Sequence, residues 1–459
     1  MKKRILSLAL AVLLLLCVVP FSTYASAAES SAYKQCYNAI VSGLKQCKSL
    51  IDIEKYGFTM EVIEPMYEEI RWNEPMLFHI TGWFTAYHYV DTGKITELEP
   101  EYSMDAANYN VAVDFVNQEI EKILDSMPYG LPKIEQALYL HDYICANYEY
   151  DLSYTYYDIY NLLARKTAVC MGYALLYDEL LSRIGIKNTS VYSPYDSINH
   201  IWNAIELDGV WYHVDTTWDD PTDDLFGRAL HSYYLQCEYC SRSMHENCIF
   251  ECDVRCTDER YESMTWRDSN YPFAFIDGSV YGLYDNEIYE VDLQTDSRRF
   301  VKSAFTDYWY ATDGSYVGRY SGFGGYGDWV YYNTPTAIIG YNPKTGEEKN
   351  IYTAPYGRIL GLYVSGNNIY LYLSETGYYD DGIAYRIELD LVEKPVGGDA
   401  NGDGKLDTFD YIYVKRAYFG TLVISDSDRV RADVNKDGEL NQFDYVLVKR
   451  AYLGTYTFR

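Results

Sequence analysis

Cys170, His200 and Asp215 carry the three groups that a cysteine enzyme uses for nucleophilic catalysis: a thiol, an imidazole and a carboxylate. A predicted helix begins at Cys170, and the free N–H groups and dipole of a helix start favour the thiolate. An imidazole beside the thiol takes up its proton, and a carboxylate fixes the tautomer of that ring. The three residues predict an acyl-transfer centre with Cys170 as nucleophile, His200 as general base and acid, and Asp215 as orienting group.

A tight turn at Asp208-Gly209 predicts how the histidine and the aspartate approach each other. Asp-Gly between two β-type runs is a strong signal for a two-residue hairpin. Counting outward from the turn places Asp215 opposite Trp202 and diagonal to His200, with all three side chains on one face. Diagonal neighbours lie about 7–8 Å apart at the backbone, so an imidazole and a carboxylate can hydrogen-bond across the gap. Each residue alone favours a structural interpretation, whereas the combination favours catalysis.

The segments that must position these residues predict an α+β region over residues 127–262. Pro132 stands in the first turn of a predicted helix, where proline is favoured, and apolar residues follow at helical spacing. A second helix is predicted from Cys170 to Gly185, because glycine is typical of a helix C-terminus. Short β-type runs follow at 189–193, 200–207 and 210–216.

The stretch from about Leu131 to Asp220 resembles bacterial transglutaminase-like proteins, which share a papain-like fold. The matching segments are His141-Asp-Tyr-Ile, Asn147-Tyr-Glu-Tyr-Asp, Cys170-Met-Gly-Tyr-Ala, His200-Ile-Trp-Asn and Trp211-Tyr-His-Val-Asp-Thr-Thr-Trp-Asp-Asp-Pro. The resemblance implies the same roles for Cys170, His200 and Asp215, acting on a protein or peptide substrate. Two acceptors stay open: water would give a peptidase or amidase, and an amine would give protein cross-linking.

Two acidic loops recur near the C-terminus, beginning at Asp399 and Asp433. Oxygen-bearing side chains stand at loop positions 1, 3, 5 and 12, and glycine stands at position 6, which is the chemistry of a calcium loop. The sequence predicts two Ca²⁺ ions and no organic cofactor. The expected ligands are Asp399, Asn401, Asp403, Lys405 and Asp410 in the first loop and Asp433, Asn435, Asp437, Glu439 and Asp444 in the second, with Lys405 and Glu439 supplying backbone carbonyls.

Residues 397–459, which hold both loops and a helix after each, resemble a type I dockerin. In that family the duplicated helices bind a cohesin module of a scaffoldin and tether enzymes into a cellulosome. The resemblance implies a cohesin partner and places the contact positions on the two helices. These positions are Thr408, Phe409, Lys415 and Arg416 in the first copy and Gln442, Phe443, Lys449 and Arg450 in the second.

The first 27 residues have the features of a signal peptide: cations at 2–4, an apolar run over 5–19 and an Ala-Ser-Ala cleavage site at 25–27. We therefore expect a secreted, extracellular protein on a cell-surface assembly. The formal net charge of −29 repels nucleic acid and anionic lipid. No later stretch is apolar over a length that crosses a bilayer. The sequence thus predicts neither a nucleic-acid partner nor membrane insertion.

The remaining segments complete a multidomain fold class. Residues 28–126 are expected to form an N-terminal, mostly helical region. Residues 266–394 lose the helical period and predict a β-rich module, propeller-like or sandwich, which is long enough for only about three propeller blades. The predicted fold class is an α+β papain-like, transglutaminase-like core, an all-β module and a small α calcium-binding dockerin.

A cysteine-rich segment lies between the candidate centre and the β-rich module. Its members are Cys237, Cys240, Cys248, Cys252 and Cys256, with His231 and His245 among them. Cys-x-x-Cys followed by further Cys or His can bind zinc, whereas secretion favours disulfides. With Cys36, Cys47 and Cys145 the cysteines outside the candidate centre form an even set of eight once the leader is removed. We therefore favour disulfides and keep zinc as the alternative.

Two classes of function follow from these features. The first is a secreted cysteine acyl-transfer enzyme that its dockerin tethers to a polysaccharide-degrading assembly. The second is a non-catalytic adhesion or binding subunit that keeps the same fold and binds through the β-rich module. Carbohydrate processing is a weaker third interpretation, because no acidic pair with recognisable glycosidase spacing supports it.

Overall fold

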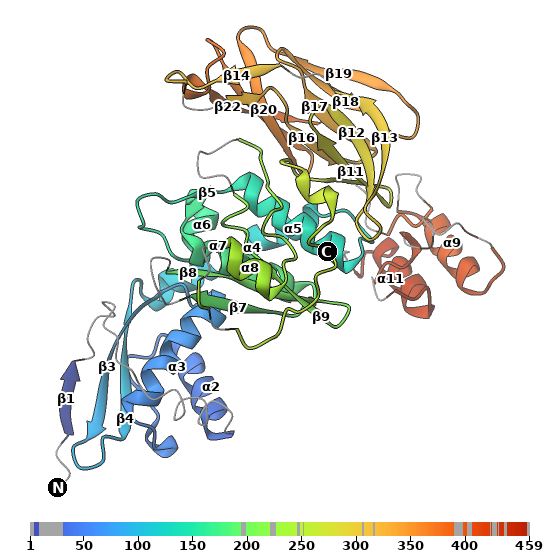
Figure 1. The fold of residues 1–459 in the computed structure, drawn as a ribbon. Coiled ribbons are helices and arrows are strands. Elements are labelled where there is room, and N and C mark those ends of the chain that lie inside the picture. Colours follow the sequence, from blue (N-terminus) through green and yellow to red (C-terminus); the bar gives the residue numbers. More distant parts are fainter. Residues whose placement is uncertain are drawn as a thin grey trace.

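The structure is a computed structural model of the chain. It describes residues 4–8, 31–193, 199–220, 226–245, 248–250, 252–304, 307–314, 317–389, 398–401, 406–422, 424, 429, 431–435 and 438–456. In Figure 1 the β-rich module lies at the top, the helices and hairpin of the candidate centre lie in the middle, the N-terminal region lies below, and the dockerin helices lie to the right. Most of the expected signal peptide falls outside the described residues.

The N-terminal region combines helices with an antiparallel sheet. Its elements are β1 (Arg4–Leu8), α2 (Ser31–Lys45), β2 (Ile51–Asp52), α3 (Met60–Asn73), β3 (Ile80–Tyr89), β4 (Ile95–Tyr102) and α4 (Ala106–Ser126), with short 3₁₀ turns at Glu54–Tyr56 and Pro75–Leu77. The strand order is β1-β3-β4-β2. The expectation of a mostly helical region was wrong between α3 and α4. Alternating apolar residues of β3 and β4 face the helices there, at a period of two.

The candidate centre is built from four helices and a three-stranded antiparallel sheet. These elements are α5 (Lys133–Asn147), α6 (Ile159–Arg165), α7 (Cys170–Arg183), α8 (Glu238–Met244), β7 (Asn188–Ser193), β8 (His200–Leu207) and β9 (Val210–Val214), with a parallel pair β5 (Glu149–Tyr150) and β6 (Thr167–Ala168). The helix starts predicted near Pro132 and at Cys170 are both present. Strand order β7-β8-β9 places the middle strand, β8, against α7.

The hairpin register predicted from Asp208-Gly209 is confirmed. Leu207 pairs with Val210, and Asn203 pairs with Val214 at the far end of the ladder. Asp208 and Gly209 both have positive φ, 52° and 82°, as a two-residue turn of the type that matches strand twist requires. The register of the hairpin therefore places residue 215 next to the start of β8.

The β-rich module consists of consecutive antiparallel sheets. The first holds β10 (Ala274–Ile276), β11 (Ser279–Tyr284), β12 (Glu287–Asp292) and β13 (Ser297–Ser303). The second holds β16 (Phe323–Tyr326), β17 (Trp329–Asn333), β18 (Ala337–Tyr341) and β19 (Glu348–Thr353). The third holds β20 (Arg358–Ser365), β21 (Asn368–Ser374) and β22 (Ile383–Glu388), and β14 (Tyr308–Tyr310) pairs with β15 (Val317–Arg319). A 3₁₀ turn at Tyr379–Asp381 precedes β22.

The first strand of each sheet lies against the first strand of the next, because β16 contacts both β10 and β20. This arrangement is of the propeller type, with three successive blade-like sheets. The approach is close: a Cβ on Gly322 would lie 2.1 Å from the backbone nitrogen of Leu362. Only glycine fits between the second and third sheets at that point.

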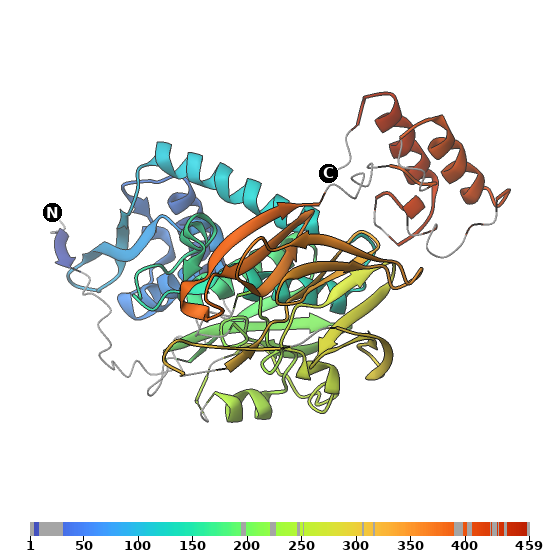
Figure 2. The ribbon, with the colours of Figure 1, turned by 90° about the horizontal axis from the view of Figure 1, so that it is seen from above.

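The dockerin helices are α9 (Thr408–Tyr418) and α11 (Gln442–Tyr452), and Figure 2 shows them as a separate unit beside the sheets. The N-cap of each helix, Asp407 or Asn441, forms a capping box with the acidic residue three positions on. Val414 and Val448 are buried between the helices with Ala400 and Ala432. Equivalent residues of the two repeats thus form one small shared core.

One hydrophobic core runs from the helices of the candidate centre into the first sheet of the β-rich module. It includes residues of α4, α5 and α7 together with Phe275 and Val280. Trp266, in a 3₁₀ turn (Thr265–Asp268), is fully buried at this junction, with ring centroids of Tyr234 and Phe273 each 6.1 Å away. The two regions therefore share apolar burial across the boundary expected near residues 262–266.

Replacing this tryptophan tests whether the shared core stabilises both regions. We expect Trp266→Ala to lower the free energy of unfolding by about 3–5 kcal/mol, because a large buried ring leaves a cavity. Urea unfolding followed by circular dichroism measures the change. Trp83→Ala is the control, since Trp83 is 38% exposed on β3, and we expect it to change stability by less than about 1 kcal/mol. Equal effects of both variants would contradict the shared core.

Candidate functional site

Cys170 is the first residue of α7 and is only partly buried. Two residues on, Gly172 lets the chain before the helix pack closely, because a Cβ there would lie 2.5 Å from Cβ of Ala168. Strand β6 and the helix start are thereby held together at the turn that presents the thiol. The Cys170 side chain lies close enough to His200 to contribute to raising the pKa of that imidazole.

His200 and Asp215 meet across the hairpin as the register predicts. His200 Nε2 lies 2.6 Å from Asp215 Oδ2, and the two residues are 4% and 1% exposed. Because Nε2 donates to the carboxylate, the other ring nitrogen is the one available to the thiol of Cys170. His200 therefore interacts with both the Cys170 side chain and the Asp215 carboxylate, and its hydrogen bond is to the carboxylate.

Backbone and charge contacts hold the Asp215 carboxylate ionised. Oδ1 accepts hydrogen bonds from the N–H groups of Thr217 and Trp218, at 2.9 and 3.2 Å. Burial raises the pKa of Asp215, but the charge and hydrogen bond of His200, with those of His245, lower it well below its ordinary value. Burial lowers the pKa of His200, and the Asp215 carboxylate with the Cys170 contact raises it to about 10.

A second histidine, His245, reaches the same carboxylate oxygen. Its Nε2 lies 2.8 Å from Asp215 Oδ2, and its Nδ1 lies 2.7 Å from the carbonyl oxygen of Ser241. The His245 ring is fully buried and stacks on Trp202, with centroids 4.5 Å apart and planes 9° from parallel. Asp215 therefore accepts four hydrogen bonds: two from imidazoles and two from the backbone.

The sequence interpretation considered His245 only as a companion of the cysteines. It lies 30 residues after Asp215, beyond the hairpin, at the end of the short helix α8. No periodicity or turn signal links such a position to the candidate centre. The one signal that the sequence offered was its place in a segment already rich in side chains capable of chemistry.

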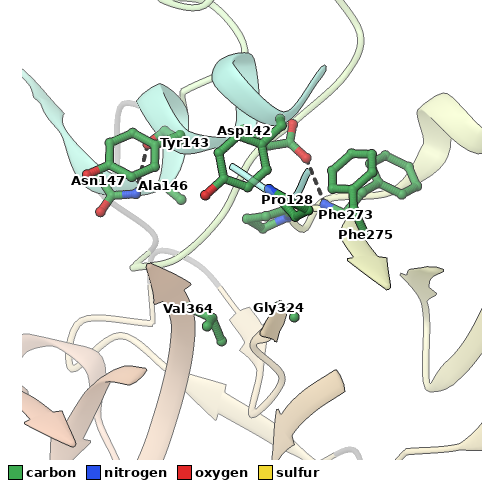
Figure 3. Close-up of a pocket in the computed structure, with 12 residues that line it drawn as sticks. Pro128, Asp142, Tyr143, Ala146, Asn147, Phe273, Phe275, Gly324 and Val364 are labelled. Atoms are coloured by element: carbon green, nitrogen blue, oxygen red, sulfur yellow. Dashed lines mark hydrogen bonds between the residues drawn. The ribbon is translucent and has the colours of Figure 1, made fainter. Parts of the chain in front are cut away.

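A second buried network joins the loop after Asp215 to the β-rich module. His141 contacts Asp142 Oδ1 at 2.9 Å and Asp219 Oδ2 at 3.1 Å, and His231 Nε2 contacts Asp142 Oδ1 at 2.9 Å. Asp142 Oδ2 accepts the N–H of Phe273 at 2.7 Å, as Figure 3 shows beside a small pocket between α5 and the sheets. The network thereby attaches the loop that follows Asp215 to helix α5.

The cysteines do not pair in this structure. All nine that it describes, including the eight outside the candidate centre, are free. The favoured expectation of disulfides is therefore not met among the described residues. The alternative grouping of His231 and His245 with the cysteines is also wrong, because these rings contact Asp142 and Asp215. Two cysteines, Cys237 and Cys240, do lie together with Glu262.

Most of the predicted calcium ligands lie in described parts of the dockerin loops, whereas Asp403, Lys405 and Asp437 fall outside them. Asp410 and Asp444 are fully buried. Asp410 Oδ1 accepts the N–H groups of Ala400 and Asn401, at 2.9 and 3.2 Å, and each aspartate closes its loop onto the following helix. The carboxylate at the last ligand position of each loop therefore contacts both the backbone of the loop and the N-cap of the following helix.

The second loop carries a carboxylate oxygen that fits a cation. Asp433 Oδ1, at loop position 1, is buried and has no hydrogen-bond partner among the described residues. Gly438, at position 6, has φ of 82°, and its N–H donates to the other oxygen of Asp433 at 2.8 Å. In the first loop, the charge of Asp399 contributes to raising the pKa of Asp410, after burial. Buried, converging carboxylates of this kind suit Ca²⁺.

The eight predicted cohesin contacts are all exposed on α9 and α11. Phe409 and Phe443 occupy equivalent places and are 68% and 59% exposed. The lysines converge, because the Nζ atoms of Lys415 and Lys449 lie 5.7 and 5.5 Å from the ring centroid of Tyr411. The other four positions, Thr408, Arg416, Gln442 and Arg450, are also at the surface.

Comparison with known families agrees with these two regions. Residues 124–216 match the family model of the transglutaminase-like superfamily, and residues 397–453 match that of the dockerin type I domain. The chain is thus a multidomain protein with a transglutaminase-like region, many antiparallel sheets and a C-terminal type I dockerin. No curated protein matches the chain.

Solved structures resemble parts of the chain at low identity. A crystal structure of a TGase has 12% identity and a TM-score of 0.21, covering 27% of this chain and 41% of that one. A protein of Cytophaga hutchinsonii described as a cysteine protease has 11% identity and a TM-score of 0.19, covering 49% and 71%. The N-terminal domain of Nup159 has 10% identity and a TM-score of 0.17, covering 42% and 44%. This chain spans less than half of that TGase.

No helix within the described residues has the length and apolar character needed to cross a membrane.

His245 provides a test of how Asp215 is held. We expect His245→Phe to slow alkylation of Cys170 by iodoacetamide about 10-fold, because the carboxylate loses a charge-assisted hydrogen bond of about 1.5–3 kcal/mol and positions His200 less firmly. The rate is measured by peptide mass spectrometry across pH. His213→Phe is the matched control: this buried histidine accepts from Trp202 Nε1 at 3.2 Å instead. Equal rates in both variants would contradict the role of His245.

The contact between His200 and Asp215 has a defined pH dependence. The pKa of His200 is raised from 6.5 to about 10, so the stabilisation from its contact with Asp215 is complete below pH 6.5 and is lost as pH rises through about 10. Asp215→Asn removes the charge, and the midpoint of the His200 ring signal in NMR titration should fall. An unchanged midpoint would contradict the coupling.

Proposed function

We propose that this protein is a secreted cysteine acyl-transfer enzyme, with Cys170 as nucleophile, His200 as general base and acid, and Asp215 as orienting group. The observation that supports it is the chain of contacts in which His200, close to the Cys170 side chain, is hydrogen-bonded to the buried carboxylate of Asp215. Such a chain stabilises an imidazolium beside a thiolate, which is the reactive form of a cysteine nucleophile.

In the proposed reaction the Cys170 thiolate attacks the carbonyl carbon of an amide, and the backbone N–H of Cys170 stabilises the oxyanion. His200 gives its proton to the departing amine, and a thioester remains on Cys170. Water or a second amine then attacks the thioester while His200 takes up the proton of the attacking group. Water yields hydrolysis, and a protein amine yields cross-linking.

Tyr150 is a further group beside the nucleophile. It is the last residue of β5 and pairs with Ala168, two residues before Cys170. Its pKa is raised by burial and then by the charge of Cys170. A phenol that stays protonated next to the thiol can donate to an oxygen of the acyl group. We propose this residue as a contact of the substrate carbonyl.

The dockerin would tether this centre to a scaffold. Two Ca²⁺ ions would complete its loops, and the exposed repeat of Phe409 with Phe443 and the basic pairs would bind a cohesin module of a scaffoldin. Extracellular assembly in a polysaccharide-degrading complex follows from that partner and from the signal-peptide features at 1–27.

A non-catalytic binding subunit is the second candidate. The β-rich module favours it, because several tyrosines of its strands and loops are exposed. Tyr308, Tyr310, Tyr356, Tyr378 and Tyr385 are each at least 38% exposed. Aromatic rings of this kind suit contacts with a ligand surface. The two candidates differ in whether Cys170 catalyses turnover of a substrate.

Acyl trapping tests the proposed activity. We expect the full chain, incubated with a casein digest and quenched in acid, to carry peptide acyl groups on Cys170 that hydroxylamine removes. Cys170→Ala should abolish the adduct and the release of products, and Cys47→Ser, a cysteine away from the candidate centre, should leave both unchanged. Product analysis with and without methylamine separates hydrolysis from transamidation. Products formed equally by Cys170→Ala would refute the enzyme.

Calcium removal tests the tether. We expect EDTA to abolish hydrogen-exchange protection of peptides from α9 and α11 in the full chain, because converging carboxylates repel one another without the ion and the core between the helices is small. Peptides from α5 and α7 serve as the internal control and should keep their protection. Binding to an immobilised type I cohesin should be lost with EDTA and return with calcium. Protection that persists in EDTA would contradict calcium-dependent folding.

A further inference from the structure

Three side chains capable of binding a metal converge outside the candidate centre: Cys237, Cys240 and Glu262. Their ligand atoms all lie within 4.8 Å of one another. Cys237 is 2% exposed and immediately precedes α8, whereas Cys240 and Glu262 are partly exposed. A tetrahedral zinc ion with Zn–S bonds of about 2.3 Å holds its thiolates about 3.8 Å apart, so the spacing suits that geometry.

Backbone hydrogen bonds orient these ligands. The N–H of Cys240 donates to Cys237 Sγ at 3.3 Å, and the N–H of Cys237 donates to Glu262 Oε1 at 2.5 Å. Arg267 Nη1 lies 3.1 Å from the other oxygen, Glu262 Oε2. The N–H group directed at the Cys237 sulfur and the Arg267 cation on the outer oxygen of Glu262 hold both side chains in place, as is usual around metal ligands.

A fourth ligand is available on either side of the cluster. Cys256, 1% exposed, lies within electrostatic reach of Cys237, and its carbonyl oxygen accepts the N–H of Glu238 at 2.6 Å. On the other side a cavity of about 340 Å³ reaches Cys240 and Glu262. The cavity gives a metal ion a path of entry and room for a water ligand.

Two other clusters of potential ligands exist in the described chain, but their atoms are already paired. In the group of His200, Asp215 and His245, both imidazoles lie 2.6 and 2.8 Å from one carboxylate oxygen. In the group of His141, Asp142 and His231, every ring nitrogen contacts a carboxylate or a carbonyl within 3.1 Å. A nitrogen that donates a proton has no lone pair for a metal. The thiol cluster is the one with free ligand capacity.

We propose that Cys237, Cys240 and Glu262 bind a zinc ion, with Cys256 or water as the fourth ligand. Soft thiolates select Zn²⁺ over Ca²⁺ and Mg²⁺. With water as the fourth ligand, binding forms two Zn–S bonds and a Zn–O bond to Glu262 and releases two thiol protons to solvent; with Cys256, a third Zn–S bond forms and a third proton is released. Neither case changes an oxidation state. The ion would join the start of α8 to the segment around Glu262, and the other end of α8 holds His245 against Asp215.

The test is metal content in the full chain. The protein is dialysed with zinc in calcium-saturated buffer, so that the dockerin loops are occupied, and zinc is measured by mass spectrometry of the metal. We expect one equivalent in the wild type and in Cys36→Ser, whose thiol is buried in the N-terminal region. Cys240→Ser should weaken binding by about 100-fold or more, and Glu262→Gln by about 10–100-fold.

A spectroscopic measurement identifies the ligands if a variant fails to fold. Cobalt in the wild-type protein should give a thiolate-to-metal charge-transfer band and tetrahedral d–d bands. Zinc below one-tenth of an equivalent would overturn the proposal, as would a Cys237–Cys240 disulfide found by intact mass in protein purified without reductant. Because zinc content is measured without substrate, this outcome is independent of whether Cys170 proves to be a nucleophile.

Discussion

A carboxylate with 1% exposure, such as that of Asp215, is stable as an anion only where hydrogen bonds and opposite charges replace its lost hydration. Asp215 obtains them from three directions: His200 on the hairpin, His245 at the end of α8, and backbone N–H groups of the loop that follows it. Removing any one of these donors leaves part of the charge unbalanced in a dry site. The elements that supply the donors must therefore be present together.

The loop after Asp215 connects the candidate centre to further elements that must also be in place. Asp219 lies against His141 of α5, and the N–H of Asp219 donates to the carbonyl of Asp215 at 3.2 Å. Asp142, next to His141, accepts the N–H of Phe273, where the β-rich module begins. The β-rich module thus supports the candidate centre in addition to any ligand of its own. The shared core around Trp266 is the apolar counterpart of this polar connection.

The parts that the sequence predicted are those with local signals. The Asp208-Gly209 turn fixes a register, and the register alone sets His200 beside Asp215. The two acidic loops and the helix that follows each of them are also signalled by residues close together in the sequence. His245 was missed because its contact depends on how an irregular segment folds back over the hairpin. The strands β3 and β4 were missed because a period of two between two helices is a weak signal against strong neighbouring helical periods.

The sheets of the β-rich module and the state of the cysteines show a different limit. Strand pairs within each sheet follow from turns, but the contact of β10, β16 and β20 depends on tertiary packing, where Gly322 permits close approach. Counting the cysteines likewise shows only whether their number is odd or even, and not which of them lie close together. Cys145 lies 3.8 Å from His141 Nε2 in the polar network, and Cys36 lies in the core of the N-terminal region. An even number of thiols spread over separate cores does not imply pairing.

The two regions of this chain with proposed functions, the candidate centre and the dockerin, balance their buried carboxylates in different ways. The charge of Asp215 is balanced by side chains and N–H groups of the protein itself, so this carboxylate needs no cation bound to it. In the dockerin, Asp433 Oδ1 is buried with no partner in the described part of the chain, and a divalent cation is the natural counter-charge. Loss of calcium should therefore release the tether while the candidate centre keeps its geometry, so that attachment and catalysis respond separately to the ion.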